Sequence, residues 1–477
     1  MADAGAARLP DEVLDWVGTV LGASVVDAAP RLGGVSREAW FVDCRAPDGA
    51  LVEVFLRRDR AASPLRASPY TSLREASLYR SLAGTGIPVP RVLAVDADLG
   101  CVLMERLSGE THFPTAVAAG HADALAARYM ALLADIHRLP VDRFDTDALG
   151  PGGTVADAVS YELGIWDRVE AASVGRPDPV RTFARRWLGA NRPAVRATAA
   201  LVHGDAGPGN FAFDGDEVTA VLDWELAHLG DPMEDLAWMA VRSVLQPFGD
   251  LDRRVGEYLA AGGQPWSAER FRYYLVAAAW RNVVALDAQL ESDDERVELA
   301  WCLAYRNLFR RLLLEEIGAA EGWPPPAAPA EPGPAETAEA AEAAEVVDWS
   351  IHGRLVAQLG AIGGGPGVDA HRIRGVTRVL RWLERRQRQG ADLDQADLAE
   401  AAGLLGRHPR SAAAMRQELC QALVAGTVGG REAHAVLSRS VAREAFLLAP
   451  VLGRLGGAHL PLIDPSAVRA APEELLP

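Results

Sequence analysis

Hydrophobic residues in the N-terminal part of the chain fall into short runs of the kind that form β-strands. Two such runs, residues 51–57 and 101–107, are rich in valine, leucine and other large apolar side chains, which suits the half-buried surface of a sheet. Between them, residues 71–82 place leucines at helical spacing behind Thr71, whose hydroxyl can cap a helix. The pattern predicts an N-terminal sheet accompanied by one amphipathic helix.

The remainder of the chain is dominated by helical spacing. Large hydrophobic residues between Tyr273 and Glu316 recur at helical intervals and predict core-forming helices. Residues 321–347 interrupt the pattern, because proline, alanine and glutamate predominate there without arginine; this composition predicts a linker. Helical spacing resumes from Trp349 to about Asp464 and predicts a compact helical bundle.

The segment around Asp205 and Asn210 combines turn-forming and polar residues. A short apolar run precedes it and predicts a strand, while its three glycines and one proline predict a tight loop that holds both polar side chains. Residues 211–222 then form two apolar runs around an Asp-Gly-Asp turn, which predicts a β-hairpin. The hairpin returns the chain and brings Asp223 beside the loop.

These three side chains have the types and spacing that phosphoryl transfer requires. In a kinase site one aspartate accepts the proton of the acceptor hydroxyl, and an asparagine and a second aspartate hold magnesium on the nucleotide phosphates. Asp205, Asn210 and Asp223 fit these roles in that order, and their hard oxygen atoms suit magnesium. His203, just before the loop, is predicted to order it by hydrogen bonds rather than to transfer protons.

The motif His-Gly-Asp-x-x-x-x-Asn at 203–210, followed by Leu-Asp-Trp at 222–224, resembles the aminoglycoside phosphotransferase-like kinases. Residues 222–238 are most similar to the branch related to the kinase domain fused to acyl-CoA dehydrogenases. The resemblance covers about residues 15–320. It implies an α+β, bilobal protein-kinase-like domain, here followed by an all-α helical module, that phosphorylates a hydroxyl group on a small molecule.

Within that resemblance, the N-terminal sheet contains the nucleotide phosphate site. Gly33, Gly34 and Ser36 precede a short strand and are expected to form the turn whose N–H groups approach the phosphates. Arg57 ends the next strand, where a kinase has its phosphate-binding lysine. Glu75 on the following helix is its expected partner; a surface glutamate paired with arginines of its own helix is the alternative.

Two features complete the expected nucleotide site. The chain contains no lysine, so the phosphate-binding cation is an arginine, and Arg58 remains the alternative to Arg57. The adenine is expected to dock against the backbone near Glu105 and Leu107, in the segment that leads to the second lobe. Neither ATP nor GTP is favoured by these residues alone.

Several acids follow the magnesium aspartate. Glu225 and Asp231 are expected to support the site. Asp231 and Asp235 are expected to cap and orient the helix that follows, with a direct substrate role as the alternative. The acidic run 291–295 resembles the amine-binding acids of aminoglycoside-modifying enzymes, although a charged loop between two helices explains it more simply.

The predicted domain organisation follows from these boundaries. Residues 1–105 form the nucleotide-binding N-lobe, and residues 106–320 form the C-lobe that carries the catalytic and substrate residues. Residues 321–347 form the linker. Residues 348–470 form a helical domain of unassigned role, which could mediate homodimerisation or bind an acyl-CoA enzyme.

Composition excludes several other classes of protein. The formal net charge of −17 argues against nucleic-acid binding, which requires a basic face. No apolar run is long enough to span a bilayer, and the acidic N-terminus lacks a secretion signal, so a cytoplasmic location is expected. Four widely separated cysteines indicate neither a zinc site nor a disulfide framework.

The sequence therefore predicts an ATP- and magnesium-dependent kinase, with GTP as the alternative nucleotide, that acts on a small-molecule hydroxyl. A hydroxy acid or a hydroxyacyl-CoA is suggested by the branch resemblance alone. An aminoglycoside-type antibiotic phosphotransferase is one alternative. A nucleotide-binding scaffold or pseudokinase with little turnover is another, which the intact Asp205, Asn210 and Asp223 argue against.

Overall fold

The computed structural model describes two compact units. It covers residues 8–31, 37–60, 63–145, 149–150, 152–294, 297–329, 355, 358, 370–460 and 463. The first unit comprises Met1–Arg168, Pro193–Tyr274 and Leu460–Pro477, and the second comprises Val169–Arg192 and Leu275–His459.

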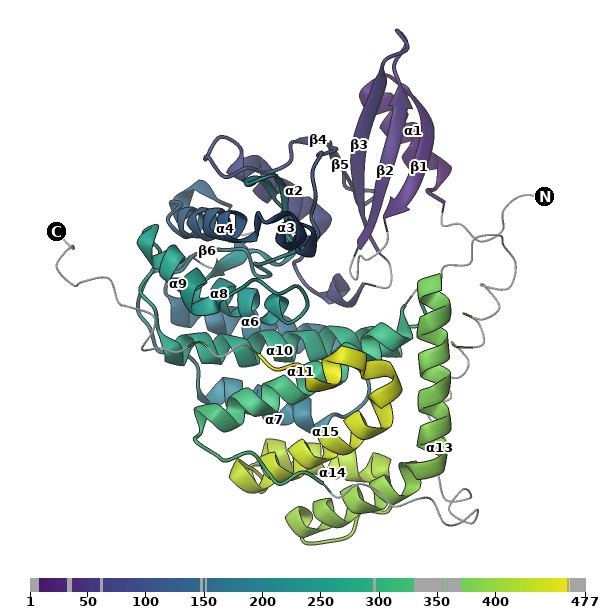
Figure 1. Cartoon of the computed structure of the whole chain (residues 1–477), viewed down its shortest axis with the longest axis vertical. Helices are drawn as coiled ribbons and strands as arrows, with labels where there is room; N and C mark the ends of the chain where they lie inside the picture. Colours follow the sequence, from purple (N-terminus) through teal and green to yellow (C-terminus); the bar gives the residue numbers. More distant parts are fainter. Residues whose placement is uncertain are drawn as a thin grey trace, which may run out of the picture. The chain divides into compact units, whose positions relative to one another are not determined.

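The first unit contains an antiparallel five-stranded sheet with the order β1-β2-β3-β5-β4 (Figure 1). The side chains of β3 alternate between its two faces. Val54 and Leu56 are buried in a hydrophobic core shared with Val13 and Val17 of α1, so Arg57 projects to the opposite face. The elements are α1 (Asp11–Leu21), β1 (Ser24–Arg31), β2 (Arg37–Arg45), β3 (Leu51–Asp59), β4 (Val92–Asp96) and β5 (Cys101–Glu105).

The helix predicted at residues 71–82 is present as α2 (Ser72–Leu82). Its start is fixed twice, because the Thr71 hydroxyl accepts the Arg74 N–H at 3.2 Å and Asp59 of β3 accepts the Ser72 N–H at 3.1 Å. The helix buries Leu78 together with the carboxylate of Glu75. One edge of α2 is thereby tied to the end of β3, near Arg57.

Short strands and helices form the rest of the first unit. Strands β7 and β8 pair antiparallel and confirm the hairpin predicted over residues 211–222. Strand β6 pairs with β9, so the loop between β6 and β7 connects one two-stranded sheet to the other. The elements are η1 (Pro64–Ala67), α3 (Phe113–Ala119), α4 (Ala122–His137), η2 (Val141–Arg143), β6 (Ala200–Val202), β7 (Phe211–Asp214), β8 (Glu217–Val221), η3 (Trp224–Leu226), β9 (His228–Gly230), α8 (Pro232–Ser243) and α9 (Leu251–Ala260).

The second unit is helical. Helix α15 packs against α11 and α13, and α14 packs against α7. Helices α6 (Val155–Ser173) and α10 (Ala268–Glu291) each run from one unit into the other. The remaining elements are α7 (Pro179–Ala190), α11 (Leu299–Ala320), α13 (Ala370–Leu405), α14 (Ala412–Ala425), α15 (Gly430–Leu452) and η5 (Gly453–Gly457).

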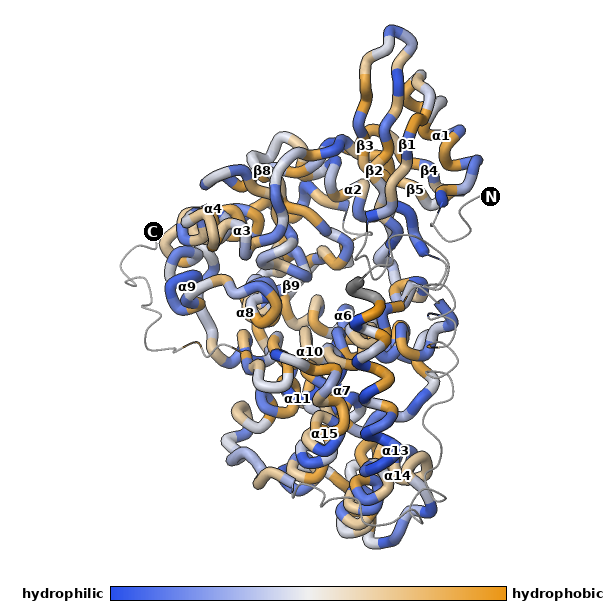
Figure 2. Tube along the Cα trace, turned by 45° about the vertical axis from the view of Figure 1, so that its right-hand side comes forward, coloured by the Kyte–Doolittle hydropathy of each residue, from blue (hydrophilic) through white to orange (hydrophobic). Residues whose placement is uncertain are grey.

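Two features of the second unit bear on the predicted helical domain. Hydrophilic positions gather along part of α13 (Figure 2), where Arg374, Arg378 and Arg381 are exposed. Of the predicted linker, residues 321–329 are described and residues 330–347 lie outside the described part.

A search of the described helices finds no segment with the length and hydrophobicity of a membrane span.

A buried ion-pair network joins α15 to α11 and α7 within the second unit. Arg306 contacts Glu444 at 3.0 Å and Asp178 at 2.9 Å. Arg310 also pairs with both acids, and Asp178 caps α7 by accepting the Val180 N–H at 2.8 Å. Although burial opposes the charged form, Arg310 and Arg306 lower the pKa of Glu444. Helix α15 is thus held to α11 by ion pairs between largely buried arginines and Glu444, whose side chain is 32% exposed.

Replacing Glu444 by glutamine is expected to lower the free energy of unfolding by about 2 kcal/mol, because two largely buried arginines lose one of the two carboxylates that they share and keep only Asp178 in common. Equilibrium denaturation at neutral pH measures this. The matched control is Glu384→Gln in the exposed pair of Glu384 with Arg388 on α13, which should cost less than about 0.5 kcal/mol.

The pH dependence gives the same prediction a second readout. The folded-state pKa of Glu444 lies below its usual value of 4.5, so its stabilisation is complete above pH 4.5 and is lost as the pH falls through the lowered value. The difference between wild type and Glu444→Gln should therefore shrink in acid. A difference that stays constant from neutral pH into the acid range would contradict this account.

Candidate functional site

The loop between β6 and β7 carries Asp205 and Asn210 and is shaped by its glycines. Gly204, Gly207 and Gly209 all have positive φ, at 77°, 134° and 94°, a conformation that other residues adopt at a cost. At Gly204 a Cβ atom would lie 2.3 Å from the carbonyl oxygen of Leu226. Only glycine therefore allows the backbone at position 204 to lie this close to Leu226.

Gly204→Ala is expected to lower the free energy of unfolding by more than about 2 kcal/mol, since it adds a backbone clash to the strain of a positive φ. Gly215→Ala is the matched control, because Gly215 also has a positive φ, of 56°, but faces open space. It should cost about 1 kcal/mol. Equal losses measured by equilibrium denaturation would show that the contact with Leu226 does not shape the loop.

His203 is committed to hydrogen bonds that order this loop. Its Nε2 lies 2.8 Å from the carbonyl oxygen of Leu222, and its Nδ1 accepts the N–H of Asp205 at 3.3 Å. With Nδ1 as the acceptor, Nε2 donates to the carbonyl of Leu222. The ring is fully buried and packs on Trp224 at a centroid distance of 4.7 Å. These contacts bind the loop between β6 and β7 to the end of β8.

Asp235 of α8 holds the same loop from the other side. Its carboxylate accepts the N–H of His203 at 2.8 Å and that of Gly204 at 2.9 Å, and it also contacts His137 at 2.9 Å. The hydroxyl of Tyr129 on α4 accepts the N–H of Gly207 at 2.9 Å. The sequence had suggested a helix-orienting role for Asp235; in the structure its oxygens bind the loop backbone.

Asp205 and Asn210 lie side by side. The Asn210 amide donates to Asp205 Oδ2 at 2.8 Å and to the Asp205 carbonyl at 2.8 Å. Arg242 of α8 donates to both carboxylate oxygens, at 2.9 and 2.8 Å. Burial raises the pKa of Asp205, although Arg242 favours its charged form. The loop thus presents a carboxylate and an amide beside one fixed positive charge.

Asp223 is joined to this pair through the backbone. The N–H of Leu222 donates to the carbonyl of Asn210 at 2.8 Å, and the N–H of Asp223 donates to the hydroxyl of Tyr79 on α2 at 3.2 Å. Asp223 has a φ of 63° and is the one non-glycine residue with positive φ in the described part of the chain. Such strain at a polar residue is typical of functional sites.

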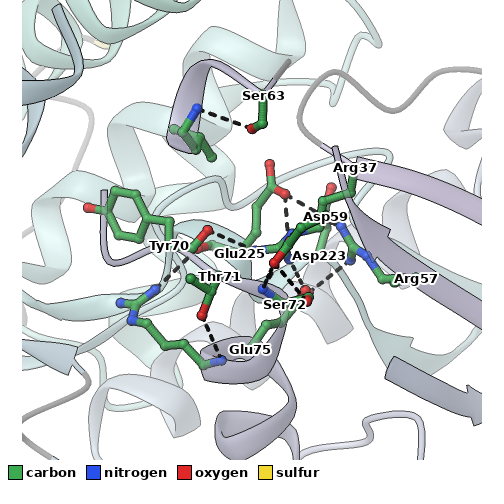
Figure 3. Close-up of polar contacts among 12 residues, drawn as sticks. Arg37, Arg57, Asp59, Ser63, Tyr70, Thr71, Ser72, Glu75, Asp223 and Glu225 are labelled. Atoms are coloured by element: carbon green, nitrogen blue, oxygen red, sulfur yellow. Dashed lines mark hydrogen bonds and ion pairs between the residues drawn. The ribbon is translucent and has the colours of Figure 1, made fainter. Parts of the chain in front are cut away.

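Arg57 of β3 connects Asp223 to helix α2, as the close-up in Figure 3 shows. Its guanidinium bonds Glu75 at 2.8 Å and Asp223 at 2.9 Å, and lies 3.5 Å from Glu225. Only 2% of the Glu75 side chain is exposed, so the alternative of a surface glutamate is wrong. The sheet, α2 and the segment after β8 converge on one arginine.

Arg37, the first residue of β2, was not expected in this cluster. Only 3% of its side chain is exposed, and it pairs with Glu75 while contacting Asp59 at 3.2 Å and Glu225 at 3.6 Å (Figure 3). In the register of β2 and β3, Arg37 stands opposite Asp59. That cross-strand pair of opposite charges was the sequence signal that could have indicated it.

The acids in this cluster titrate differently. Although burial opposes ionisation, Arg57 lowers the pKa of Asp223. Burial and the nearby charge of Asp223 raise the pKa of Glu225 to about 7, against the pull of Arg37 and Arg57. Asp223 is therefore a permanent anion at neutral pH, whereas Glu225 changes its charge there.

The other predicted residues are less closely joined to this centre. Gly33, Gly34 and Ser36 lie outside the described residues. Glu105 ends β5, where its N–H donates to the Arg91 carbonyl at 3.0 Å and its carboxylate accepts the Arg91 N–H at 2.7 Å, and Leu107 follows two residues later. Asp231 is the N-cap of α8 and is bound by Arg270 at 2.8 Å.

Comparison with known proteins assigns this chain to a family. The model of the phosphotransferase enzyme family matches residues 27–280. Mouse acyl-CoA dehydrogenase family member 10 is 28% identical over 53% of this chain and 27% of its own length. A probable acyl-CoA dehydrogenase of Arabidopsis thaliana is 26% identical over 49% of this chain and 32% of its own. The chain thus spans about a third or less of these relatives.

Two further similarities concern phosphotransferases. Viomycin phosphotransferase of Streptomyces vinaceus is 32% identical over 25% of this chain and 41% of its own length. A solved structure of a candidate aminoglycoside phosphotransferase from Ralstonia eutropha has a TM-score of 0.50 at 18% identity, covering 66% of this chain and 99% of its own. This likeness confirms the predicted kinase-like α+β fold. The chain belongs to the phosphotransferase enzyme family.

Proposed function

We propose that this protein transfers the γ-phosphate of ATP to a hydroxyl group of a small molecule and that the reaction depends on magnesium. The observation that carries the proposal is the convergence of Asp205 and Asn210 with Asp223, which Arg57 links to Glu75. These are the residue types that hold and move charge in phosphoryl transfer. GTP is the alternative nucleotide.

In the proposed reaction Asp205 orients the acceptor hydroxyl and takes its proton as the oxygen bonds to the γ-phosphorus. The bond from that phosphorus to the bridging oxygen of the nucleotide breaks, and the leaving diphosphate carries the electron pair. Asp205 is suited to this because Arg242 and Asn210 fix its carboxylate while 18% of its side chain is exposed. The acceptor can therefore reach it from solvent.

Asn210 and Asp223 would hold the magnesium ion. Both offer oxygen donors, and in the described part of the chain no three His, Cys, Asp or Glu side chains are grouped to hold a metal by themselves. A site with few protein ligands fits magnesium, which keeps waters and binds substrate phosphates. When bound, the ion would neutralise charge on the phosphates.

Arg57 would bind the nucleotide phosphates, with its orientation set by Glu75. Although burial opposes the charged form, Glu75, Asp223 and Glu225 raise the pKa of Arg57 above its usual value. It is a permanent cation that offers a fork of donors to phosphate oxygens. Gly33, Gly34 and Ser36 are proposed to cover the phosphates, and the backbone from Glu105 to Leu107 to receive the adenine.

The proposed acceptor is a hydroxy acid or a hydroxyacyl-CoA. Its support is the similarity to acyl-CoA dehydrogenase family members. An acyl-CoA enzyme is accordingly a proposed partner, with the helices of residues 348–470 as the docking or dimerisation surface. The proposed boundaries are residues 1–105 for the N-lobe, 106–320 for the C-lobe and 348–470 for the helical domain.

An aminoglycoside-type acceptor is the second candidate, supported by the similarity to viomycin phosphotransferase. One observation weighs against it. Glu291, in the acidic run that could bind amines, accepts the N–H groups of Gly175 at 2.8 Å and Arg176 at 3.2 Å. That carboxylate is therefore bound by backbone N–H groups of its own unit. The acyl-type acceptor is preferred because the acyl-CoA dehydrogenase relative matches 53% of this chain and viomycin phosphotransferase matches 25%.

The test is a panel assay with purified protein, magnesium and radiolabelled ATP or GTP. Hydroxy acids, hydroxyacyl-CoAs and aminoglycosides serve as acceptors, and Asp205→Ala serves as the inactive control. Label on a hydroxy acid or hydroxyacyl-CoA, lost in the variant, would support the proposal. Label on aminoglycosides alone would replace the acceptor class, and nucleotide binding without any turnover would favour the scaffold.

A further inference from the structure

Arg242 is the single arginine of α8 and donates from every nitrogen of its guanidinium to the loop between β6 and β7. Nη1 contacts both carboxylate oxygens of Asp205 at 2.9 and 2.8 Å. Nη2 contacts Oδ1 of Asn210 at 3.0 Å, and Nε contacts the carbonyl oxygen of Pro208 at 2.9 Å. One side chain from outside the loop thus binds its carboxylate, its amide and its backbone.

The loop glycines leave the space that this side chain occupies. A Cβ atom on Gly207 would lie 3.3 Å from Cβ and Cδ of Arg242, and one on Gly209 would lie 2.9 Å from its Nη2. A side chain on Gly209 would meet the guanidinium itself, and one on Gly207 would crowd the Cβ and Cδ atoms of Arg242. The two glycines therefore leave room for Arg242 and also form the turn.

The contacts of Arg242 also determine which way the Asn210 amide points. Its oxygen accepts from Arg242, and its nitrogen donates to Oδ2 and to the backbone carbonyl of Asp205. Rotating the amide by half a turn would set its NH₂ group against the guanidinium. Arg242 thereby orients Oδ1 of Asn210, the oxygen that would bind magnesium.

We propose that Arg242 is a positioning residue for phosphate transfer, an inference that rests on the proposed function. It holds the Asp205 carboxylate and the Asn210 amide in the one arrangement that serves acceptor and magnesium together. The segment from His203 to Asn210 contains neither arginine nor lysine, so its fixed positive charge comes from α8. Only the planar fork of arginine reaches three acceptors at once.

The test compares R242A and R242K with wild type in the phosphate-transfer assay. R242A should lower kcat by about a hundredfold, comparable to the loss of one preorganised donor, while KM for the nucleotide changes less than about threefold. R242K, which keeps the charge but loses the fork, should lie between. Arg128→Ala is the matched control, because Arg128 of α4 is an arginine of the same unit with 55% of its side chain exposed, and it should leave kcat unchanged.

A second readout separates positioning from folding. Millimolar guanidinium should raise kcat of R242A toward that of wild type, because the free cation can occupy the vacated space, whereas equal sodium chloride should not. The inference is overturned if R242A keeps wild-type kcat. It is equally overturned if R242A and R242K lose thermal stability and activity together and guanidinium restores neither. Wild-type protein that transfers no phosphate would instead defeat the proposed function itself.

Discussion

Asp205→Asn is expected to lower kcat for phosphate transfer by about a thousandfold, because the variant cannot take the acceptor proton. Nucleotide affinity should stay within about threefold of wild type, since the contacts of Asp205 are with Arg242 and Asn210 rather than with the Arg57 cluster. Steady-state kinetics with a saturating acceptor and fluorescence titration of the nucleotide measure the two quantities separately.

The matched control is Asp214→Asn, which changes an exposed aspartate at the end of β7. It introduces the same chemical change a short distance along the chain and should leave kcat and nucleotide affinity unaltered. If Asp205→Asn retained more than about a tenth of wild-type kcat, proton removal by this carboxylate would be excluded as a rate-determining contribution.

Arg57→Gln is expected to lower kcat/KM for the nucleotide by about a thousandfold, the scale on which an arginine contributes to phosphoryl transfer. Its loss also leaves Glu75, Asp223 and Glu225 with less positive charge among them. Arg57→Lys should fall between, because one ammonium keeps the charge but replaces the fork that bridges Glu75 and Asp223. Kinetics at varied nucleotide concentration provide the measurement.

Arg58→Gln is the control for this series, since Arg58 is the neighbouring arginine of β3 and its side chain projects to the other face of the sheet. It should change kcat/KM by less than about threefold. If Arg58→Gln lowered kcat/KM as much as Arg57→Gln does, Arg58 would again be a candidate for binding the phosphates. A loss at Arg58 alone would remove Arg57 from the site.

The parts of the site that a short sequence pattern contains could be predicted. Asp205 and Asn210 are five residues apart on one glycine-rich loop, and a two-stranded hairpin brings Asp223 back to it. Local turn chemistry determines both features. Helical periodicity predicts α2, and the family resemblance indicates Glu75 as the partner of Arg57 on that helix, although neither predicts that Glu75 is buried.

The contacts that depend on long sequence separation could not be predicted. Arg242 lies 32 residues beyond Asn210 and contacts it only because α8 packs against the loop between β6 and β7. Arg37 binds Glu75, 38 residues later, only because β2 and α2 meet at one end of the sheet. The spacing of Arg242 does not distinguish it from an ordinary surface residue, whereas the pairing of Arg37 with Asp59 across β2 and β3 could have indicated Arg37.

The C-terminal helices illustrate the same limit. Their periodicity predicts helices but not what those helices pack against. Glu444 of α15 contacts Arg306 and Arg310 of α11, so part of the predicted C-lobe and part of the predicted helical domain fall within one compact unit. Buried ion pairs between distant segments carry no periodic signature.

The most direct test of the central claim is to follow the γ-phosphate of labelled ATP in the presence of wild-type protein, magnesium and a hydroxyacyl-CoA or hydroxy acid, with water as the background acceptor. The account predicts that the label appears on the acceptor oxygen, that omitting magnesium prevents this, and that Asp205→Asn abolishes it. Nucleotide that binds to the wild-type protein but retains its γ-phosphate, with neither transfer nor hydrolysis, would contradict the account.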